Sequence, residues 1–432
     1  MQINIQNIGL IENSDIELSG LTVIAGKNDS GKSTVGKLIF SIIKSISRYK
    51  EDLEEDKENN IKKIVDRIYF NIRRKINFDD NIEAKRLFYS KFFFEDIMQN
   101  GSEAISTRKE FINLSEQINI PQIIELLDSL ENIINQNDSK EESVKRAFKK
   151  ILYSEFLGEI TDKNSNQKSK VVIKEKSNSI LDINFFDLKD IEFNIYDELY
   201  FNDATIIETP MILNYQETIS SSKTYFEIRD KKDRLSYLGM PNLPLHIKDL
   251  DTKIKDSIYD NNLFKENNQV ENKIYEIING KMMFIQNEQE FVYLKNDGKK
   301  YHTLNTANGI KSFGIIQMLE NGGFLDDRSL IIIDEPEVHL HPKWQLKYAE
   351  LIVELAKSDI NILVTTHSPY ILEALELYSK NIKDKTNYYL AKEIKENRYN
   401  LENVNNNLEA IYKELSEPFS KLEELSLEKF EW

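Results

Sequence analysis

The 432-residue sequence contains no cysteine. Disulfides, iron–sulfur clusters and zinc sites with thiolate ligands are therefore excluded. The sequence also lacks an apolar run of the about 18 residues that a membrane-spanning helix needs. Its first residues, Met-Gln-Ile-Asn-Ile, do not have the basic and then apolar character of a signal peptide. These absences predict a cytoplasmic protein with no membrane segment.

Basic residues are fewer than acidic residues, so the formal net charge is −16. A chain this acidic is unsuited to binding nucleic acid over its whole surface, although a local basic patch still acts within about 10 Å. Apolar residues make up 40% of the sequence, which is enough to build a substantial core. The length permits two or three compact domains.

A glycine-rich stretch near the N-terminus carries the clearest chemistry in the chain. Residues 26–34, Gly-Lys-Asn-Asp-Ser-Gly-Lys-Ser-Thr, match the phosphate-binding pattern G-x-x-x-x-G-K-[ST]. An apolar run before the loop predicts a strand, and apolar residues at helical spacing after it predict a helix, the context in which such loops bind phosphate. The nucleotide-binding residues that we expect are Gly26, Asn28, Ser30, Gly31, Lys32, Ser33 and Thr34. Among them, Lys32 would reach the β- and γ-phosphates and Ser33 would bind Mg²⁺.

The residue pattern divides the chain into five segments. Residues 1–47 predict a short sheet with the phosphate loop, and residues 48–160 predict amphipathic helices that form an insertion. Residues 161–300 return to strands and then to helices, beginning with a polar connector at 161–170. Residues 301–406 hold the remaining chemistry, and residues 407–432 predict an acidic helical tail.

Basic residues cluster within the predicted helical insertion. The first cluster lies between positions 62 and 75 and the second between positions 145 and 150, and acidic residues are interleaved with both. Charge runs of this kind usually form a solvated helix face, and a surface for nucleic acid or a protein partner is the alternative. The sequence leaves both interpretations open.

Two carboxylates and a histidine follow apolar runs in the segment 301–406. Asp334 and Glu335 end the run 330–333, and His367 follows the run 360–364. Each run predicts a strand buried on both faces, and the carboxyl ends of such strands are where open α/β sheets bind ligands. Asp334 would hold Mg²⁺, Glu335 would orient or deprotonate the attacking water, and His367 would hydrogen-bond the γ-phosphate. This set predicts ATP hydrolysis, with ATP and Mg²⁺ as cofactors.

Residues 333–342, Ile-Asp-Glu-Pro-Glu-Val-His-Leu-His-Pro, and residues 365–369, Thr-Thr-His-Ser-Pro, resemble a known family. They are similar to ABC-type ATPases of the OLD, RecF and SMC group, which includes AAA family ATPases of the Septu and PARIS antiphage systems. The resemblance implies an α/β fold, an ABC-type P-loop NTPase head in which helices flank a mixed β-sheet, with a large helical insertion. It also implies a homodimer that sandwiches ATP between two heads, with room for higher oligomers. The similarity covers residues 1–47 and 300–375, and the middle of the chain matches only in layout.

The sequence departs from this family at the signature, the segment that reaches the γ-phosphate of the other subunit. Thr-Ala-Asn-Gly-Ile-Lys at 306–311 stands in its place, and Ala307 occupies the position two residues before Gly309 where the family carries serine. Either Asn308 or Lys311 supplies the missing donor, or hydrolysis is slow and ATP mainly holds the dimer together. The segment could also be only a glycine-containing helix start.

Five further positions have weaker signals. His341 stands where transporters carry an aspartate at the dimer interface, and with His339 it suggests a metal site for which the sequence offers no third ligand. We therefore interpret His341 as a residue of helix-start packing and dimer contact. Gln216 is the candidate for the glutamine that such heads place near Mg²⁺. Asp249-Leu250-Asp251 lies in a helical run, and we interpret its carboxylates as surface groups.

The sequence predicts no nuclease domain within this chain. Residues 368–432 lack the Glu plus Asp-x-Asp set of a Toprim nuclease, and the five histidines form no HNH-like cluster. The leading hypothesis is an ATPase that acts as sensor or scaffold in a bacterial antiphage system, controlling a separate HNH-type or Toprim-type nuclease in response to a phage trigger. The alternative is an ATPase of DNA repair or chromosome maintenance, similar to RecF and SMC, that binds DNA directly. A transporter ATPase is disfavoured because the sequence lacks a proper signature.

Overall fold

The computed structural model describes residues 1–115, 120–136, 139–161, 167–188, 190–224, 242–258 and 269–417. The chain forms two compact units. The head unit comprises Met1–Ser47 and Phe148–Trp432, and the helical unit comprises Arg48–Ala147. Helix α7 (Lys140–Phe156) crosses this division, so the helical unit ends at Ala147 and not at residue 160 as the sequence led us to expect. The reason is that the later part of α7 packs on the head sheet, where the ring centroids of Phe148 and Phe193 lie 5.2 Å apart.

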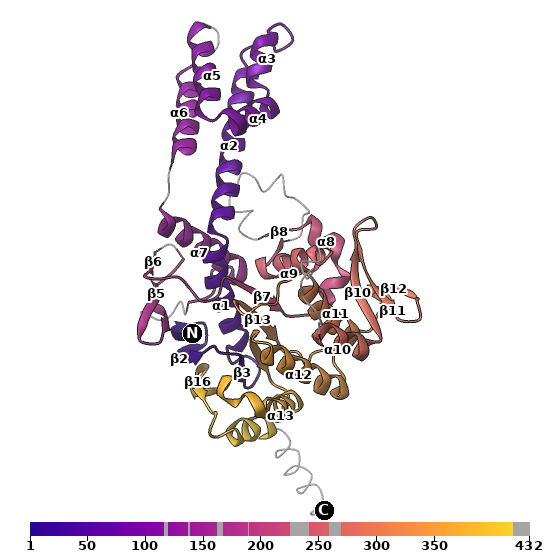
Figure 1. Cartoon of the computed structure of the whole chain (residues 1–432). Coiled ribbons are helices and arrows are strands. Elements are labelled where there is room, and N and C mark those ends of the chain that lie inside the picture. The colour runs from indigo at the N-terminus through magenta and orange to yellow at the C-terminus, as the bar shows by residue number, and fades with distance from the viewer. Residues whose placement is uncertain are drawn as a thin grey trace, which may run out of the picture. The chain divides into compact units, whose positions relative to one another are not determined.

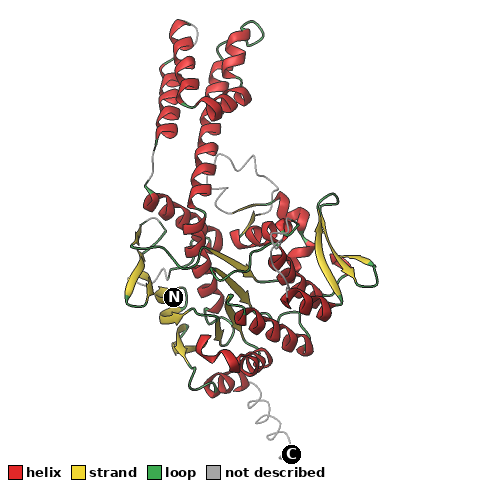
Figure 2. Ribbon diagram, in the orientation of Figure 1, coloured by secondary structure: helices red, strands yellow, loops and turns green. Residues whose placement is uncertain are grey.

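A large mixed sheet forms the centre of the head unit (Figure 2). The described strands are ordered β6-β5-β4-β1-β2-β16-β15-β3-β14-β13-β7. Strands β3, β14, β13 and β7 run parallel, whereas β1, β2, β4, β5 and β6 pair antiparallel. Their bounds are β1 Gln2–Ile8, β2 Ile11–Glu17, β3 Leu21–Ala25, β4 Ser169–Glu175, β5 Asn178–Phe185, β6 Ile191–Ile195, β7 Asp203–Ile207, β13 Ser329–Asp334, β14 Asn361–Thr366, β15 Thr386–Lys395 and β16 Arg398–Asn403.

The parallel strands explain the uninterrupted apolar runs of the sequence. All residues of β3 and β14 are buried, as are the first five residues of β13, because helices cover both faces of this part of the sheet. The helices of the head unit surround the sheet (Figure 1), and the expected fold class, an α/β P-loop NTPase head with a mixed sheet, is confirmed. They are α1 Lys32–Ser47, α8 Gln216–Ser221, α9 Leu245–Asp256, α10 Gln269–Ile278, α11 Asn308–Asn321, α12 Pro342–Lys357 and α13 Pro369–Tyr378, with short 3₁₀ helices η1 Pro210–Asn214, η3 Thr303–Asn305 and η4 Ser379–Lys385.

A separate three-stranded antiparallel sheet precedes α11. It consists of β10 (Gly280–Ile285), β11 (Glu290–Lys295) and β12 (Lys300–His302), and a short parallel pair, β8 (Lys223–Thr224) and β9 (Asn242–Leu243), lies elsewhere in the chain. Strands β10 and β11 form an antiparallel hairpin, and Gly280 begins β10. Asn279 takes the left-handed conformation that terminates α10, with φ of 58°. A Cβ at Gly280 would lie 2.4 Å from the carbonyl oxygen of Leu294, so this position needs glycine for close strand packing.

The end of the described chain packs on the head core. Residues 409–417 are mainly helical, Ile411 is buried, and Leu408, Tyr412 and Leu415 pack against the core. The remainder of the predicted acidic tail, 418–432, and positions 162–166 of the predicted connector lie outside the described residues. Within the described ranges, no helix combines the length and the apolar character needed to cross a bilayer.

The helical unit is built from antiparallel helices. It contains α2 (Tyr49–Arg73), α3 (Ile82–Phe88), α4 (Ser90–Asn100), α5 (Ser102–Leu114) and α6 (Pro121–Asn135). Helix α2 packs against α4 and α6, and α5 packs against the same two helices (Figure 1). The amphipathic stripes read from the sequence form the core of the unit, which includes Val65, Ile68, Ile72, Phe93, Leu127 and Leu130.

One buried cation crosses this core. Arg108 is only 2% exposed, and its Nε donates to the carbonyl oxygen of Leu87 at 2.7 Å. Its Nη1 pairs with Asp96 at 2.5 Å and donates to the carbonyl oxygen of Ala104, and the guanidinium lies 4.0 Å from the ring centroid of Phe93. A single side chain therefore links α3, α4 and α5.

We expect Arg108→Ala to destabilise the helical unit by about 3 kcal/mol, because it leaves Asp96 and two carbonyl oxygens without their buried donor. Thermal unfolding followed by circular dichroism measures the change. Lys91→Ala is the control, since Lys91 and Glu95 form an exposed pair 3.9 Å apart that contributes little to stability. Equal melting temperatures for the two variants would contradict the role of Arg108.

Candidate active site

The parallel strands bring the predicted site residues to one edge of the sheet. Thr366 pairs with Ala25, so β14 and β3 end side by side, and Asp334 pairs with Thr365, so β13 ends beside β14. The phosphate loop, the Asp334-Glu335 pair and His367 therefore follow three adjacent strands at their carboxyl ends. This edge is where an open α/β sheet binds ligands.

The phosphate loop packs tightly against its neighbours. A Cβ at Gly26 would lie 2.9 Å from Cβ of Ala391, and one at Gly31 would lie 2.8 Å from Cδ1 of Ile11. Gly31 also has a φ of 85°, which favours glycine, and Ser30 donates to the carbonyl oxygen of Lys27 at 2.7 Å. Asn28 is exposed, whereas Ser30 and Gly31 are buried. These contacts hold the loop backbone in a tight turn that would wrap closely around a phosphate.

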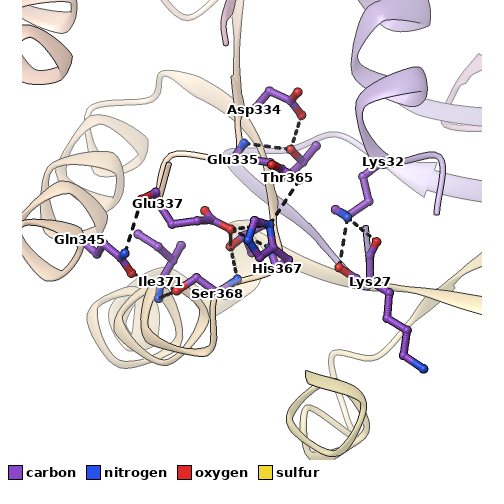
Figure 3. Close-up of polar contacts among 12 residues, drawn as sticks. Lys27, Lys32, Asp334, Glu335, Glu337, Gln345, Thr365, His367, Ser368 and Ile371 are labelled. Carbon is purple, nitrogen blue, oxygen red and sulfur yellow. Dashed lines mark hydrogen bonds and ion pairs between the residues drawn. The ribbon is translucent and has the colours of Figure 1, made fainter. Parts of the chain in front are cut away.

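Lys32 lies folded across the loop (Figure 3). Its Nζ donates to the carbonyl oxygens of Gly26 at 3.1 Å and Lys27 at 2.6 Å. Burial lowers the pKa of Lys32, and the nearby carboxylates Glu335 and Asp334 oppose that shift. A phosphate bound in the loop would supply the negative charge that this buried ammonium lacks.

Lys27, by contrast, points outward. Its Nζ lies 3.0 Å from Glu414 and 2.7 Å from Glu417, both in the last described helix. Hydrogen bonds from these two carboxylates raise the pKa of Lys27. The C-terminal helix is thereby fastened to the outer side of the phosphate loop.

The side chains of Ser33 and Asp334 fit a magnesium ion. Ser33 lies in the first turn of α1, and its Oγ donates to Oδ1 of Asp334 at 2.9 Å. The hydroxyl of Thr365 donates to the same carboxylate oxygen. Burial raises the pKa of Asp334, and the hydrogen bonds from Thr365 and Ser33 oppose that shift. Mg²⁺ prefers hydroxyl, carboxylate and phosphate oxygens, so this donor set matches the predicted metal ligands.

Glu335 and His367 face each other beside the loop. The Nδ1 of His367 lies 3.3 Å from a carboxylate oxygen of Glu335 and 3.3 Å from one of Glu337. Glu335 has a φ of 47°, a left-handed conformation that is costly for a residue with a side chain and is typical of functional sites. Its backbone N–H donates to the carbonyl oxygen of Thr365 at 3.1 Å, which anchors this turn to β14.

Glu337 is a residue that the sequence analysis did not assign. It is 7% exposed, and its Oε1 accepts hydrogen bonds from Oγ1 of Thr366 at 2.8 Å and from the backbone N–H of His367 at 2.7 Å (Figure 3). Gln345 donates to the carbonyl oxygen of Leu340 and accepts a bond from Ser368. These contacts fix the backbone that carries His367. The sequence signal for Glu337 was its place in the motif, because it is a second glutamate directly after Asp-Glu-Pro.

Glu208 was also missed. It follows β7, whose Ile207 pairs with Ile333, so Glu208 and Asp334 leave neighbouring parallel strands at the same edge. The expected residue, Gln216, instead begins α8 and donates to the carbonyl oxygen of Leu213 at 3.1 Å. The available signal was that Glu208 directly follows Ala-Thr-Ile-Ile at 204–207, a run with the composition of a strand.

The predicted signature begins α11. Ala307 is its N-cap residue, and a Cβ at Gly309 would lie 2.9 Å from the Trp344 ring. Lys311 is 2% exposed, and its Nζ donates to Asn214 at 2.9 Å and to Asn308 at 3.3 Å. Burial lowers the pKa of Lys311. Lys311 therefore already has partners within its own chain, and one of them is Asn308, the other expected substitute donor.

His341 caps α12. Its Nδ1 accepts a hydrogen bond from the backbone N–H of Lys343 at 3.3 Å, and His339 nearby has a φ of 67°. Among the described residues, no group of three or more histidine, aspartate or glutamate side chains is arranged to hold a metal ion.

The interpretation of Asp249 and Asp251 as surface groups was wrong. Asp251 is 5% exposed and lies 2.6 Å from Lys255, and the Asp249 side chain, 10% exposed, lies 2.7 Å from Lys44. Both are covered because α9 packs against β7 and its neighbours. Asp249 also pairs with Lys253 at 3.1 Å.

A family model described as an AAA ATPase domain matches residues 1–372 of the chain. The chain belongs to this AAA ATPase family. Septu protein PtuA of Bacillus thuringiensis is 27% identical to this AAA ATPase over 143 residues, which cover 29% of this chain and 36% of PtuA. A probable ATPase of retron Ec83 from Escherichia coli is 40% identical over 60 residues, covering 13% of this chain and 10% of that protein. These matches confirm the resemblance to ATPases of defence systems, and they span little more than a third of the relatives' length at most.

Solved structures of SMC heads are also similar. The SMC head domain from Thermotoga maritima has a TM-score of 0.40 at 11% identity, covering 93% of this AAA ATPase and 98% of that chain. An Smc head bound to the C-winged helix domain of ScpA has a TM-score of 0.41 at 10% identity, covering 93% and 96%.

Thr365→Val should weaken Mg²⁺-dependent ATP binding by this AAA ATPase about 10-fold, because Asp334 loses the hydroxyl that orients it. A fluorescent ATP analogue titrated with and without Mg²⁺ measures the effect. Thr22→Val on β3 is the matched control, since Thr22 is equally buried and donates to the carbonyl oxygen of Glu17. If both variants bind like the wild type, Thr365 does not orient the metal ligand.

Proposed function

We propose that this AAA ATPase binds and hydrolyses ATP with Mg²⁺ as the sensor or scaffold subunit of a bacterial antiphage system that controls a separate nuclease. One observation carries the catalytic part of the proposal. Ser33 and Thr365 both donate to Asp334, while Glu335 and His367 lie 3.3 Å apart at the same sheet edge. The arrangement holds groups for the metal, for the attacking water and for the γ-phosphate together.

Each group has a role that its surroundings support. The loop N–H groups and Lys32 bind the phosphates, and Lys32 exchanges the carbonyl oxygens of Gly26 and Lys27 for phosphate oxygens. Bound Mg²⁺ supplies Lewis-acid neutralisation of the phosphate charge, and Ser33 and Asp334 would hold it. Glu335 orients the attacking water and accepts its proton, and His367 hydrogen-bonds the γ-phosphate.

The biological setting rests on the relatives. PtuA is named as a Septu protein, and the second relative as a probable retron ATPase. By analogy, ATP would join two copies of this chain, with Gly309 of one copy completing the site of the other. A separate nuclease of HNH or Toprim type would be held by the assembly until a phage trigger changes its nucleotide state. A nuclease gene beside this one would support this setting.

A second candidate function is direct DNA binding, as in RecF-like or SMC-like ATPases. It is favoured by a hollow of about 480 Å³ within the helical unit. Cations outnumber acids around it and aromatic rings lie among them, a combination suited to a phosphate backbone. The hollow is lined by Tyr69, Arg73, Arg74, Lys75, Ile76, Asn77, Phe78, Asp79, Lys85 and Tyr89.

Glu335→Gln should reduce ATP hydrolysis about 100-fold or more while preserving ATP binding, because the amide cannot accept a proton from water. Phosphate release measures hydrolysis, and light scattering after size exclusion measures the ATP-dependent dimer that the variant should trap. Glu288→Gln, at an exposed pair with Lys300, is the control. Unchanged hydrolysis in the Glu335 variant would refute its assignment as the base.

The DNA-binding alternative predicts that duplex DNA binds with an affinity that falls steeply as salt rises, because phosphate contacts release counterions. Replacing Arg73, Arg74 and Lys75 with alanine should then reduce both the affinity and its salt dependence. Fluorescence anisotropy at several salt concentrations measures this, with Lys91→Ala as the control within the same unit. Absence of binding at physiological salt would exclude this alternative.

A further inference from the structure

A buried histidine near the site lies between two carboxylates. His246 is 1% exposed, its Nδ1 lies 2.5 Å from Oε2 of Glu155, and its Nε2 lies 2.8 Å from Oε2 of Glu208. Because both ring nitrogens face carboxylate oxygens, both carry protons and the ring is an imidazolium. Burial opposes this charge, but the hydrogen bonds to Glu155 and Glu208 outweigh it and raise the pKa of His246 to about 9. The three side chains form a continuous chain of charge-assisted hydrogen bonds.

Helix α7 supplies the far end of this chain and also caps α9. The other oxygen of Glu155 accepts from the backbone N–H of His246 at 3.1 Å, and Oγ of Ser154 accepts from the N–H of Leu245 at 2.9 Å. The N-cap residue of α9, Pro244, makes no side-chain capping bond of its own. A carboxylate at a helix N-terminus is favoured by the helix dipole, so Glu155 binds both the backbone and the ring of His246.

Glu208 forms the near end, beside the proposed metal ligands. It follows β7 in register with Asp334 at the end of β13. Its Oε1 lies 3.6 Å from Nζ of Lys37, which is one helical turn after Ser33 on α1. The hydrogen bond from His246 lowers the pKa of Glu208 to about 2. Its contacts with His246 and Lys37 therefore hold the Glu208 carboxylate at the sheet edge where Ser33 and Asp334 meet.

We propose that Glu208 is a second carboxylate, beside Asp334, at the sheet edge where Mg²⁺ would bind. His246 and Glu155 are positioning residues that connect Glu208 to α7. The inference rests on the proposed ATP and Mg²⁺ site. Mg²⁺ commonly keeps several waters and is held through one or two carboxylates together with phosphates, so Glu208 would bind its hydration shell opposite Asp334. The partners behind such a ligand fix its orientation.

The connection also gives α7 a route to the nucleotide site. Residues 140–147 of this helix belong to the helical unit, and Glu155 lies in the part that belongs to the head unit. A movement of Glu208 on metal binding would displace the hydrogen-bonded ring of His246. That displacement would in turn change the contact between His246 and Glu155 of α7. The part of α7 that belongs to the head unit would thereby respond to metal binding at this site.

The first test compares nucleotide affinity with and without Mg²⁺. In Glu208→Gln, His246→Gln and Glu155→Gln, the gain in affinity for a fluorescent ATP analogue on adding Mg²⁺ should fall about 10-fold or more. In the His246 and Glu155 variants, binding in EDTA should be unchanged. Asp251→Asn is the matched control, because it removes another buried ion pair of α9. Should His246→Gln fail to fold, Glu155→Gln decides, since it keeps the histidine and the side-chain size.

The possible outcomes separate this inference from the proposed function. If Mg²⁺ increases the affinity for the ATP analogue as much in the His246 and Glu155 variants as in the wild type, the positioning role of these two residues is refuted. The proposed ATP site is not affected by that result. A wild type that gains no affinity from Mg²⁺ overturns the proposed function itself.

The second test follows α7 directly. Adding Mg²⁺ and the ATP analogue should slow amide hydrogen exchange at residues 148–156 in the wild type and in Asp251→Asn. The effect should disappear in His246→Gln, because the link between Glu208 and Glu155 is broken. Equal protection of α7 in the His246 variant would overturn the coupling, whereas a merely structural histidine would leave this ligand response unchanged.

Discussion

The register between β13 and β14 is the constraint on which the site depends. Pairing of Asp334 with Thr365 puts the carboxylate proposed to bind Mg²⁺ beside the hydroxyl that donates to it. A shift of one residue would turn every side chain of β13 to the opposite face. Both strands are buried on both faces, so a changed register would also disturb the packing of their side chains against the covering helices. The arrangement of side chains at this edge therefore depends on the packing of side chains along β13 and β14.

Strand β7 is fixed at both ends by charge. At its beginning, Asp203 lies 2.6 Å from Lys253 and also pairs with Lys44. Beyond its end, Glu208 is held by His246. Burying so many charges costs desolvation energy that their mutual attraction only partly offsets, so hydrophobic side chains would stabilise the strand at least as well. What the charges add is direction, because a hydrogen-bonded carboxylate has one orientation while an apolar contact tolerates several.

Local patterns in the sequence were sufficient to predict the phosphate loop, the strand-terminal Asp334-Glu335 pair and most of the parallel strands. Each of these combines a motif with an apolar run, and both are read within a few residues. Glu208 was not predictable in this way, because its role depends on which strand lies beside β13, a long-range choice. His246 and Glu155 are 91 residues apart in the chain, and no local pattern reports such a pairing. Gln216 was chosen by residue type alone, and it stays a prediction, since the structure shows only that it begins α8 and donates to Leu213.

The missing serine of the signature bears on how this ATPase would use ATP. Ala307 offers no side-chain donor, and Lys311 is occupied by Asn214 within its own subunit. In the proposed dimer, the γ-phosphate would then depend more on donors of the subunit that binds it, namely the loop N–H groups, Lys32 and His367. In the proposed dimer, such a site would gain less from the partner in the transition state, which would favour a long-lived ATP-bound assembly over rapid turnover. That balance would suit the proposed sensor, which holds an effector until it is triggered.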